Sequence, residues 1–268
     1  MKIENCSALI TGASAGIGLE FARQLADRAR SLILVARREQ RLNDLRDQLT
    51  RGHSSLTVHI HETDLSDLSQ LKELVAWLDR EEIDVDLLIN NAGLGDNGPF
   101  ATSDPARTDQ MTLLNMVALT SLTRRLLPQM IARKHGGVLN VSSSAGFLPI
   151  PDFAVYAATK AYVTSFSEAL RTELRGTGVS VCALCPGPVH TEFGEVAKRP
   201  GERPERGPEF VYVPVDKVVR DALAALEADR PIVIPGFVMK LGMLFVRLTP
   251  MPILRWTTRL KTQRTAQQ

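Results

Sequence analysis

The sequence predicts an α/β protein whose doubly wound, mostly parallel sheet has seven strands, with helices on both of its faces. Three observations predict this fold class. Short apolar runs alternate with longer amphipathic stretches, as in successive βαβ units. The alternation continues through the 268-residue chain without a repeat, a heptad pattern or a low-complexity tract. The first strand pattern leads into a glycine-rich turn and then a helical pattern. We therefore expect a single domain over residues 1–268.

Seven short runs are rich in β-branched and aliphatic residues and have the length of strands. They are Ser7–Ile10, Ser31–Val35, Leu56–Ile60, Val85–Asn90, Val138–Ser142, Val179–Leu184 and Ile232–Ile234. Longer stretches between them repeat apolar residues at helical spacing. These are Gly18–Arg28, Gln40–Thr50, Leu68–Arg80, Pro105–Lys134, Phe153–Arg175 and Asp216–Ala228. Strands and helices that alternate in this way predict parallel pairing of the strands.

One stretch, Lys198–Glu209, is linker-like because it is rich in proline, glycine and charge. Strand and helix patterns follow it. We therefore interpret it as part of a substrate lid over residues 190–215 and not as a domain boundary. Long loops within compact domains are often of this functional kind.

Composition favours a globular protein of a reducing compartment. The apolar share of 44% and the charged share of 23% are ordinary for a chain with a sizeable core. A formal net charge of +2 gives no reason to expect nucleic-acid binding. The chain runs into its first strand without a signal-peptide pattern, and its three cysteines suit a reducing compartment. We expect a cytoplasmic protein.

Two pairs of potential metal ligands occur within strand patterns. Cys182 and Cys185 form a C-x-x-C pair in a β-branched run, and His59 and His61 alternate in another. Neither pair is accompanied by a second ligand pair, and the cysteines do not begin a helix. We interpret all four as strand residues and expect no metal site.

The segment ALITGASAGIGLEF, residues 8–21, places Gly12, Gly16 and Gly18 between a strand and a helix. Glycines there permit a tight turn and let a pyrophosphate approach backbone N–H groups at the positive end of the helix. The spacing differs from the commoner G-x-G-x-x-G fingerprint. The turn therefore predicts a dinucleotide site, with a plain glycine-rich turn as the alternative.

The end of the second predicted strand indicates which dinucleotide would bind. An NAD site usually has an acidic residue there that holds the ribose 2′-hydroxyl. This sequence has Ala36, Arg37 and Arg38 instead. A guanidinium pairs with a 2′-phosphate, which a carboxylate would repel. We predict NADP(H) held by Arg37, while Arg38 either assists it or solvates the next helix.

Tyr156 and Lys160 stand four residues apart in VYAATK, and no acidic residue adjoins the lysine. On a helix the two side chains would share one face. A cation in that position favours tyrosinate and lowers the phenol pKa from about 10. The pair indicates a proton-transferring tyrosine, although the same spacing also occurs by chance on solvated helices.

An ordered set of motifs over residues 5–195 resembles the short-chain dehydrogenase/reductase family. The set comprises TGASAGIG, Asp64–Leu65, NNAG at Asn90–Gly93, Asn115, Ser143, YAATK and PGPVHT. Ser143 follows Asn115 by 28 residues and precedes Tyr156 by 13, as the family requires. The resemblance implies a Rossmann-type fold. It also implies an NADP(H)-dependent oxidoreductase that interconverts a ketone and a secondary alcohol.

The resemblance also implies a catalytic role for each of four residues. Ser143 polarises the substrate oxygen, and Tyr156 exchanges a proton with it. Lys160 lowers the tyrosine pKa and holds the ribose, and Asn115 holds a water that links the lysine to solvent. Strand alternation turns Ser143 away from Ser142 and Ser144, which are interpreted as packing or cap residues.

The other implied cofactor contacts come from three loops. These are the glycine-rich turn, the loops on the adenosine side and the loop that clamps the nicotinamide. Asp64 could instead serve only as a helix cap. The residues, apart from Arg37, Arg38, Tyr156 and Lys160, are Gly12, Ser14, Ala15, Gly16, Ile17, Gly18, Asp64, Leu65, Asn91, Ala92, Gly93, Pro186, Gly187, Val189 and Thr191.

The C-terminal extension, residues 236–268, is apolar and basic. No acidic residue follows Asp229, and six cations lie within the extension, which leaves the rest of the chain with 26 basic and 30 acidic residues. At about 12 residues before Pro250, its apolar stretch is too short to span a bilayer, which needs about 20. A lid over an apolar pocket, a dimer interface and a membrane-surface contact remain open. One helical face would carry Phe237, Val238, Leu241, Leu244, Phe245 and Leu248.

Two function classes follow from these observations. The first is the oxidoreductase described above, acting on an apolar small molecule. The second is a non-catalytic regulator or scaffold that senses the dinucleotide. Intact Ser143, Tyr156 and Lys160 favour the enzyme, because a regulator needs none of the three. The resemblance further implies a homodimer or homotetramer that pairs through Pro105–Lys134 and Phe153–Arg175.

Overall fold

The strands form one parallel sheet in the order β3-β2-β1-β4-β5-β6-β7 within the described part of the chain. The computed structural model describes residues 1–199, 208–250 and 252–255. Each predicted strand is present, with ends that shift by at most two residues, and each neighbouring pair is parallel. The bounds are β1 Ser7–Thr11, β2 Ser31–Ala36, β3 Thr57–Glu62, β4 Leu87–Asn90, β5 Gly136–Val141, β6 Val179–Leu184 and β7 Ile232–Val233.

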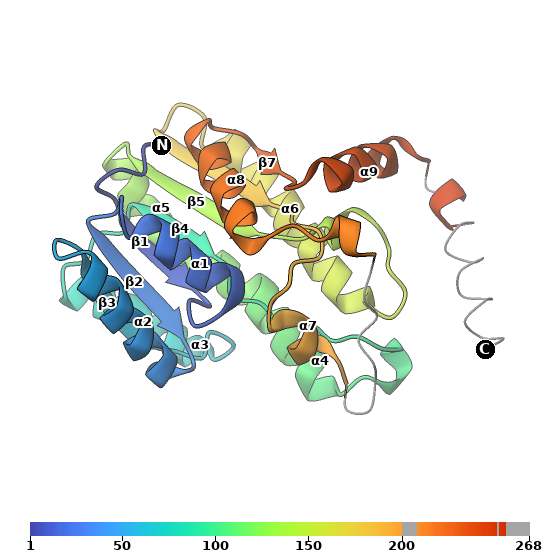
Figure 1. Cartoon of the computed structure of the whole chain (residues 1–268), viewed down its shortest axis with the longest axis horizontal. Coiled ribbons are helices and arrows are strands. Elements are labelled where there is room, and N and C mark those ends of the chain that lie inside the picture. Colours follow the sequence, from blue (N-terminus) through green and yellow to red (C-terminus); the bar gives the residue numbers. More distant parts are fainter. Residues whose placement is uncertain (200–207, 251, 256–268) are drawn as a thin grey trace.

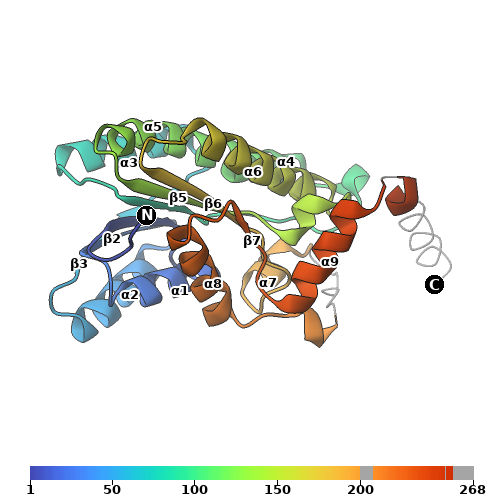
Figure 2. The same cartoon turned by 90° about the horizontal axis from the view of Figure 1, so that it is seen from above.

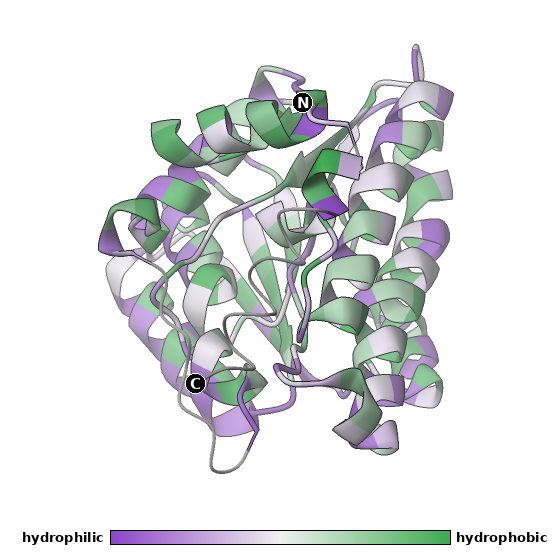
Figure 3. Ribbon diagram, turned by 90° about the vertical axis from the view of Figure 1, so that its right-hand side faces the viewer, coloured by the Kyte–Doolittle hydropathy of each residue, from purple (hydrophilic) through white to green (hydrophobic). Residues whose placement is uncertain are grey.

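Helices cover both faces of the sheet (Figure 2). One face carries α1 (Gly16–Leu25), α2 (Glu39–Gly52) and α8 (Val215–Glu227). The other carries α3 (Leu68–Arg80), α5 (Leu119–Ala132) and α6 (Ala154–Glu173). The central strands are buried along their whole length, as expected for a parallel sheet between two helical layers. Figure 3 shows hydrophobic strands flanked by helices of mixed polarity.

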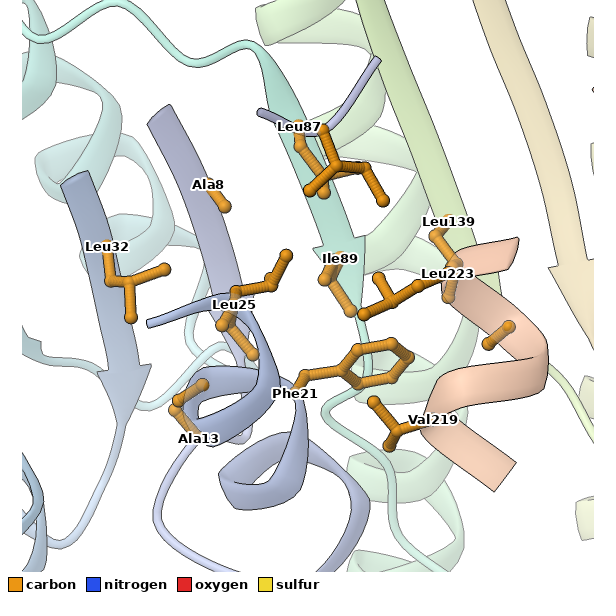
Figure 4. Packing of buried hydrophobic residues seen from close by; sticks show 14 of the residues in the cluster. Ala8, Ala13, Phe21, Leu25, Leu32, Leu87, Ile89, Leu139, Val219 and Leu223 are labelled. Atoms are coloured by element: carbon orange, nitrogen blue, oxygen red, sulfur yellow. The ribbon is translucent and has the colours of Figure 1, made fainter. Parts of the chain in front are cut away.

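The core on the first face joins helices that are far apart in the sequence. Phe21 and Leu25 of α1 meet Val219 and Leu223 of α8 above the strands that carry Ile89 and Leu139 (Figure 4). Each side chain is at most 3% exposed. Burying a side chain of this size contributes about 1.5–3 kcal/mol, so this contact fixes where α1 begins relative to the sheet.

The structure corrects one predicted helix. The stretch expected as a single helix over Pro105–Lys134 is divided into α4 (Pro105–Thr112), the π-helical turn η2 (Leu113–Ala118) and α5. The wider turn carries the buried Asn115, whose amide bonds to a neighbouring loop. π-Helical turns often mark functional sites, and no residue pattern distinguishes them from α-helix.

Short helices flank the carboxyl edge of the sheet (Figure 1). They are the 3₁₀ turns η1 (Phe100–Thr102), η3 (Ser144–Phe147) and η4 (Glu209–Val211), together with α7 (Phe193–Ala197). The last described long element, α9 (Phe237–Leu248), lies beyond β7. Over the residues that the structure describes, no helix is both long and apolar enough to cross a membrane.

The sheet order reverses direction between β1 and β4. In open parallel sheets, ligands bind at the carboxyl ends of the strands beside such a reversal. The glycine-rich turn follows β1 and the NNAG motif follows β4, so the fold places both motifs at this position.

Candidate active site

The glycine-rich turn after β1 takes a conformation that requires glycine. Gly12 and Gly16 have φ values of +66° and +55°, which side chains rarely adopt. A Cβ on Gly18 would lie 2.3 Å from the Gly12 carbonyl oxygen. The turn therefore folds closely on itself and begins α1 at Gly16, with the unpaired N–H groups of the first helical turn at its edge.

Thr11 and Asn91 lock together the ends of β1 and β4. The Thr11 hydroxyl accepts the backbone N–H groups of Asn91 and Ala92 at 2.9 and 3.0 Å. The Asn91 amide donates to the carbonyl oxygens of Thr11 and Gly12 at 2.9 and 3.2 Å. Thr11 was not predicted from the sequence, although it directly precedes the first glycine of the motif.

Basic side chains gather at the end of β2. Arg38 donates to the Ser14 hydroxyl at 3.1 Å, which brings it across the glycine-rich turn. The Arg37 guanidinium is half-exposed and lies 3.8 Å from the Asp64 carboxylate. Asp64 itself accepts from Ser66 in a turn, so it does not cap the following helix. Asp67 has that role, with 2.8 Å to the Ser69 N–H.

Glu192 lies beside these arginines, and the sequence analysis did not identify it. Its carboxylate pairs with Arg38 at 2.9 Å and with Arg41 at 2.6 Å. These hydrogen bonds lower the pKa of Glu192, so it is a carboxylate at neutral pH. The pairs connect the loop before α7 to the start of α2 and set an acidic group next to the predicted phosphate-binding arginines.

Tyr156 and Ser143 form the centre of the site. Tyr156 lies near the start of α6 and is buried, and Ser143 ends the loop after β5. Burial raises the pKa of Tyr156 to about 12, and the neighbouring Ser143 hydroxyl acts in the opposite direction. Ser143 Oγ accepts from the Ala145 N–H at 3.1 Å, which orients the hydroxyl.

Lys160 lies one helical turn after Tyr156 and is only 5% exposed. Its Nζ donates to the Val141 carbonyl oxygen at 2.8 Å and is 5.7 Å from the centre of the Tyr156 ring. Burial lowers the pKa of Lys160 to about 8. The predicted lowering of the tyrosine pKa is therefore wrong for the chain's own groups, because the loss of hydration outweighs the distant ammonium.

Asn115 faces the same interior from η2. Its Oδ1 accepts the Leu94 N–H at 2.9 Å, and its Nδ2 donates to the Leu94 carbonyl and to Thr159 Oγ1 at 2.9 and 3.0 Å. A Cβ on Gly93 would lie 3.4 Å from Asn115 Oδ1 and 3.5 Å from Lys160 Nζ. Asn115 thus positions the loop after β4 beside Lys160. Its predicted water-holding role stays a prediction.

The neighbouring serine is structural, as expected. Ser142 Oγ donates to the Lys160 carbonyl at 2.8 Å and shares a 2.7 Å hydrogen bond with Thr164, which ties β5 to α6. The Ser144 N–H donates to the Pro186 carbonyl at 2.8 Å. This bond brings the loop with Pro186 and Gly187 next to Ser143.

The loop after β6 approaches both the turn and the C-terminal helix. A Cβ on Gly16 would lie 3.2 Å from Thr191, and one on Gly187 would lie 2.8 Å from Met239 of α9. Val189 packs against the hydrophobic core that α1, α2 and α8 share. The structure therefore brings the predicted nicotinamide loop to the edge of the site, between the glycine-rich turn and α9.

Apolar rings surround the phenol. Phe153 meets Tyr156 edge to face with ring centres 5.5 Å apart, and Phe193 of α7 lies 5.3 Å away on a tilt. Leu94 and Met111 complete this buried cluster. Only the structure reveals these neighbours, since they come from four separate parts of the chain.

A buried carboxylate fastens α7 over this cluster. Asp96 pairs with Arg199 at 2.6 Å and with Arg107 at 3.4 Å. Arg107 also donates to the Gly95 carbonyl at 2.7 Å and to the Val196 carbonyl of α7. The Asp96 side chain is 5% exposed, so these two arginines take the place of water around its carboxylate.

Three of the four residues weighed as metal ligands lie within strands, and Cys185 directly follows β6. Cys182 and Cys185 are buried free thiols at β6, and burial raises the pKa of both. His59 and His61 of β3 pack on the Trp77 ring, with ring centres 6.1 and 4.9 Å away. The described residues contain no cluster of three or more potential metal ligands.

Comparison with known proteins decides the family. Residues 7–200, which include the turn, Ser143, Tyr156 and Lys160, match the family model described as short chain dehydrogenase. The chain belongs to the short-chain dehydrogenase family. The sheet of this short-chain dehydrogenase and the order of its motifs agree with that assignment.

This short-chain dehydrogenase resembles enzymes of known activity. It is 37% identical over 190 residues to the NADP-dependent 3-hydroxy acid dehydrogenase YdfG of Escherichia coli, covering 70% of this chain and 75% of that protein. It is 38% identical over 188 residues to sulfoacetaldehyde reductase 2 of Chromohalobacter salexigens, covering 69% and 73%.

Two solved structures have similar folds. A short-chain dehydrogenase from Sphingobium yanoikuyae in complex with NADPH has a TM-score of 0.79 and 32% identity, covering 87% of this chain and 88% of that one. The bulky-bulky ketone specific alcohol dehydrogenase from Comamonas testosteroni has a TM-score of 0.75 and 31% identity, covering 87% and 86%.

The residues of this chain fit NADP(H). The tight turn leaves no room for side chains at Gly12 and Gly18, which is the condition for close approach of a pyrophosphate. The end of β2 carries arginines where an NAD enzyme has an acid. The short-chain dehydrogenase is accordingly an NADP(H)-dependent oxidoreductase that acts on CH–OH groups.

Proposed function

We propose that this enzyme interconverts apolar ketones and secondary alcohols, with Tyr156 as the group that exchanges the proton. One observation carries the proposal: the buried Tyr156 phenol, next to the Ser143 hydroxyl, lies inside a cluster of apolar rings. A proton donor in such surroundings fits a substrate that presents a polar oxygen on an apolar body. When bound, NADP(H) supplies or accepts the hydride.

The proposed division of roles follows from the contacts. In reduction, Tyr156 gives its phenol proton to the substrate oxygen, and Ser143 donates a hydrogen bond to the same oxygen. Because burial holds the pKa of Tyr156 at about 12, the phenol keeps its proton at neutral pH and serves as an acid. In oxidation it must first lose that proton. The buried ammonium of Lys160 is the group that would stabilise the resulting tyrosinate.

The lining of the site favours an apolar substrate over an anionic one. Two of the relatives are named for a 3-hydroxy acid and for sulfoacetaldehyde, which are both anions. Here Phe153, Phe193 and Met111 surround the phenol, and Asp96 engages Arg107 of α4 and Arg199 of the lid. Of the two substrate classes, bulky ketones agree better with these contacts.

Steady-state assays with NADPH test the substrate class. The panel contains aryl-alkyl and long-chain ketones for reduction, and matched secondary alcohols and 3-hydroxy acids for oxidation. We expect the highest kcat/KM for the apolar ketones. A preference for the 3-hydroxy acids would overturn the apolar assignment and leave the dehydrogenase activity standing.

We also propose that Arg37 and Arg38 hold the 2′-phosphate. Arg37→Ala is expected to weaken NADPH binding at least about tenfold, because a guanidinium–phosphate pair can supply the required 1.4 kcal/mol or more. NADH binding should stay the same. Fluorescence titration with both cofactors measures the effect. Arg46→Ala is the control, since Arg46 pairs with its neighbour Asp47 on the same helix, α2. Equal losses for both cofactors would exclude a phosphate contact.

We propose that residues 190–215 form a lid, of which α7 is the described part over Tyr156. Phe193 covers the phenol, and the Asp96 ion pairs fasten α7 to the loop after β4. The inner side of α9 would complete the wall of the substrate site, because Met239 contacts Gly187. Residues 200–207 lie outside the described part of the chain.

Asp96→Asn tests the fastening of the lid. It leaves two arginines without their shared carboxylate, and removing one partner of a buried ion pair costs about 3–5 kcal/mol. We expect a lower urea midpoint and faster proteolysis at the lid. Asp104→Asn is the control, because asparagine preserves the cap that Asp104 gives to the Ala106 N–H. Unchanged proteolysis in Asp96→Asn would show that the ion pairs do not hold the lid.

We further propose a homo-oligomer that pairs through α5 and α6 and resides in the cytoplasm. The two helices are tied side by side, since Thr120 and Tyr162 share a 2.7 Å hydrogen bond and Tyr162 stacks on Phe166. The buried free thiols agree with a reducing compartment. Sedimentation velocity of the full chain measures the assembly, and a monomer at all concentrations would refute it.

A further inference from the structure

The outer face of α9 presents large apolar side chains to solvent. Phe237 is 80% exposed, Phe245 63% and Leu248 73%. Val238, Leu241 and Leu244 extend the same face, and Phe210 of η4, which packs next to α9, is exposed as well. Exposed apolar patches of this kind usually mark an interaction surface.

The opposite side of α9 packs against the rest of the protein. Met239, Gly242, Met243 and Val246 are less exposed than the outer residues. Met239 contacts Gly187, and Arg247 lies 5.8 Å from the centre of the Phe147 ring in η3. The helix is therefore anchored to the site by one face, and its outer apolar face is not needed for that anchoring.

The charge around this face is mostly positive. Lys240 and Arg247 flank it on α9, Arg255 follows, and the sequence adds three further cations before its end with no acidic residue after Asp229. Glu209 of the adjoining η4 is the acidic side chain next to the patch in the described residues, and it pairs with His190 at 2.7 Å. The surface complements an anionic partner.

A second copy of the chain would not complement the outer face of α9. The other large apolar side chains exposed in the described residues are scattered over separate elements or, for Ile253, follow α9 in the same extension: Leu68, Phe100, Val117, Ile131, Val196 and Ile253. A partner copy therefore offers no matching apolar patch except its own α9. Pairing two α9 helices would bring two uniformly cationic extensions together, which is unfavourable.

We propose that α9 docks on an anionic lipid surface, with its outer apolar side chains among the headgroups and acyl chains and its cations at the phosphates. An interfacial helix needs this combination of an apolar face with basic flanks. Lys and Arg side chains can extend from such a helix toward the phosphates. The docking stands independently of which substrate the enzyme uses, although it would place the mouth of the site beside the lipid.

Vesicle sedimentation of the full chain tests the proposal. The enzyme should pellet with vesicles of phosphatidylcholine mixed with phosphatidylglycerol, bind pure phosphatidylcholine less, and dissociate as salt is raised. Phe237→Ser/Phe245→Ser should lower the affinity for the mixed vesicles at least about tenfold. The NADPH affinity of this double variant should be unchanged, and that result would show that the variant is folded. Phe100→Ser is the control, because it removes a phenylalanine outside α9 whose exposure, 62%, is close to the 63% of Phe245.

A charge variant gives a second readout that leaves the apolar face intact. Lys240→Gln/Arg247→Gln should weaken binding to the mixed vesicles and leave binding to pure phosphatidylcholine nearly as it is. Absence of wild-type binding to the mixed vesicles, or equal binding by Phe237→Ser/Phe245→Ser, would overturn the proposal. So would a larger sedimenting mass for the wild type than for that variant without lipid, because a second copy would then cover α9.

Discussion

Tyr156→Phe is expected to lower turnover by about 10²–10⁴-fold, the range typical of losing a general acid. The substitution removes the phenol hydroxyl and keeps the ring, so the packing against Phe153 and Phe193 should survive. NADPH affinity should therefore stay close to that of the wild type. Steady-state kinetics and NADPH titration measure the two effects separately.

Tyr162→Phe is the matched control, six residues further along α6. Its hydroxyl bonds to Thr120 on α5, away from Ser143. We expect near wild-type turnover for Tyr162→Phe. If Tyr156→Phe and Tyr162→Phe had similar turnover, another residue would have to supply the proton.

Lys160→Met is expected to abolish most turnover and weaken cofactor binding while it raises stability at neutral pH. Burial lowers the pKa of Lys160 from 10.5 to about 8, which corresponds to a cost of about 3 kcal/mol for holding the charged form inside the fold. The variant also loses the hydrogen bond to the Val141 carbonyl, worth about 1 kcal/mol. We expect a net gain of about 2 kcal/mol in the free energy of unfolding at pH 7.

The pH dependence of this gain has a definite sign. Below pH 8 the lysine is protonated in both states, so the folded wild type bears the whole cost. Between pH 8 and 10.5 the unfolded chain binds more protons, and wild-type stability rises with pH on account of this group. The advantage of Lys160→Met should therefore shrink over that interval.

Urea unfolding at several pH values measures the change. Lys217→Met is the control, since Lys217 is exposed on α8 and pairs with Asp221 at 3.1 Å. It should alter stability little at any pH. A Lys160→Met variant that is less stable than the wild type at pH 7 would show that the buried ammonium is stabilised by contacts that compensate its burial.

The sheet was predictable because each strand carries its own signal. Ser31–Val35 and Val179–Leu184 are almost wholly apolar or β-branched, and the helices between strands repeat leucine at helical spacing. The glycines of the first turn were predictable for a similar reason, since Gly12 and Gly16 occupy conformations that side chains rarely adopt. These features are local in the sequence.

The missed features depend on groups that are distant in the sequence. The π-helical turn at Asn115 is stabilised by Leu94 and Thr159, and no pattern within residues 105–134 encodes it. Glu192 meets Arg38 only because the loop after β6 folds against the start of α2. The error over the tyrosine pKa has the same origin, because spacing reveals the neighbouring cation but does not reveal how completely both groups are buried.

Transfer of deuterium from NADPH labelled at nicotinamide C4 tests most directly whether the enzyme reduces ketones through Tyr156. Product from a bulky apolar ketone is analysed by mass spectrometry for the wild type and for Tyr156→Phe at equal enzyme concentration. We predict an alcohol that carries the label on its carbinol carbon, formed by the wild type and reduced at least about 10²-fold in Tyr156→Phe. Tight NADPH binding without labelled alcohol from any ketone or aldehyde would contradict the proposed carbonyl reduction. It would favour a regulator that senses the dinucleotide.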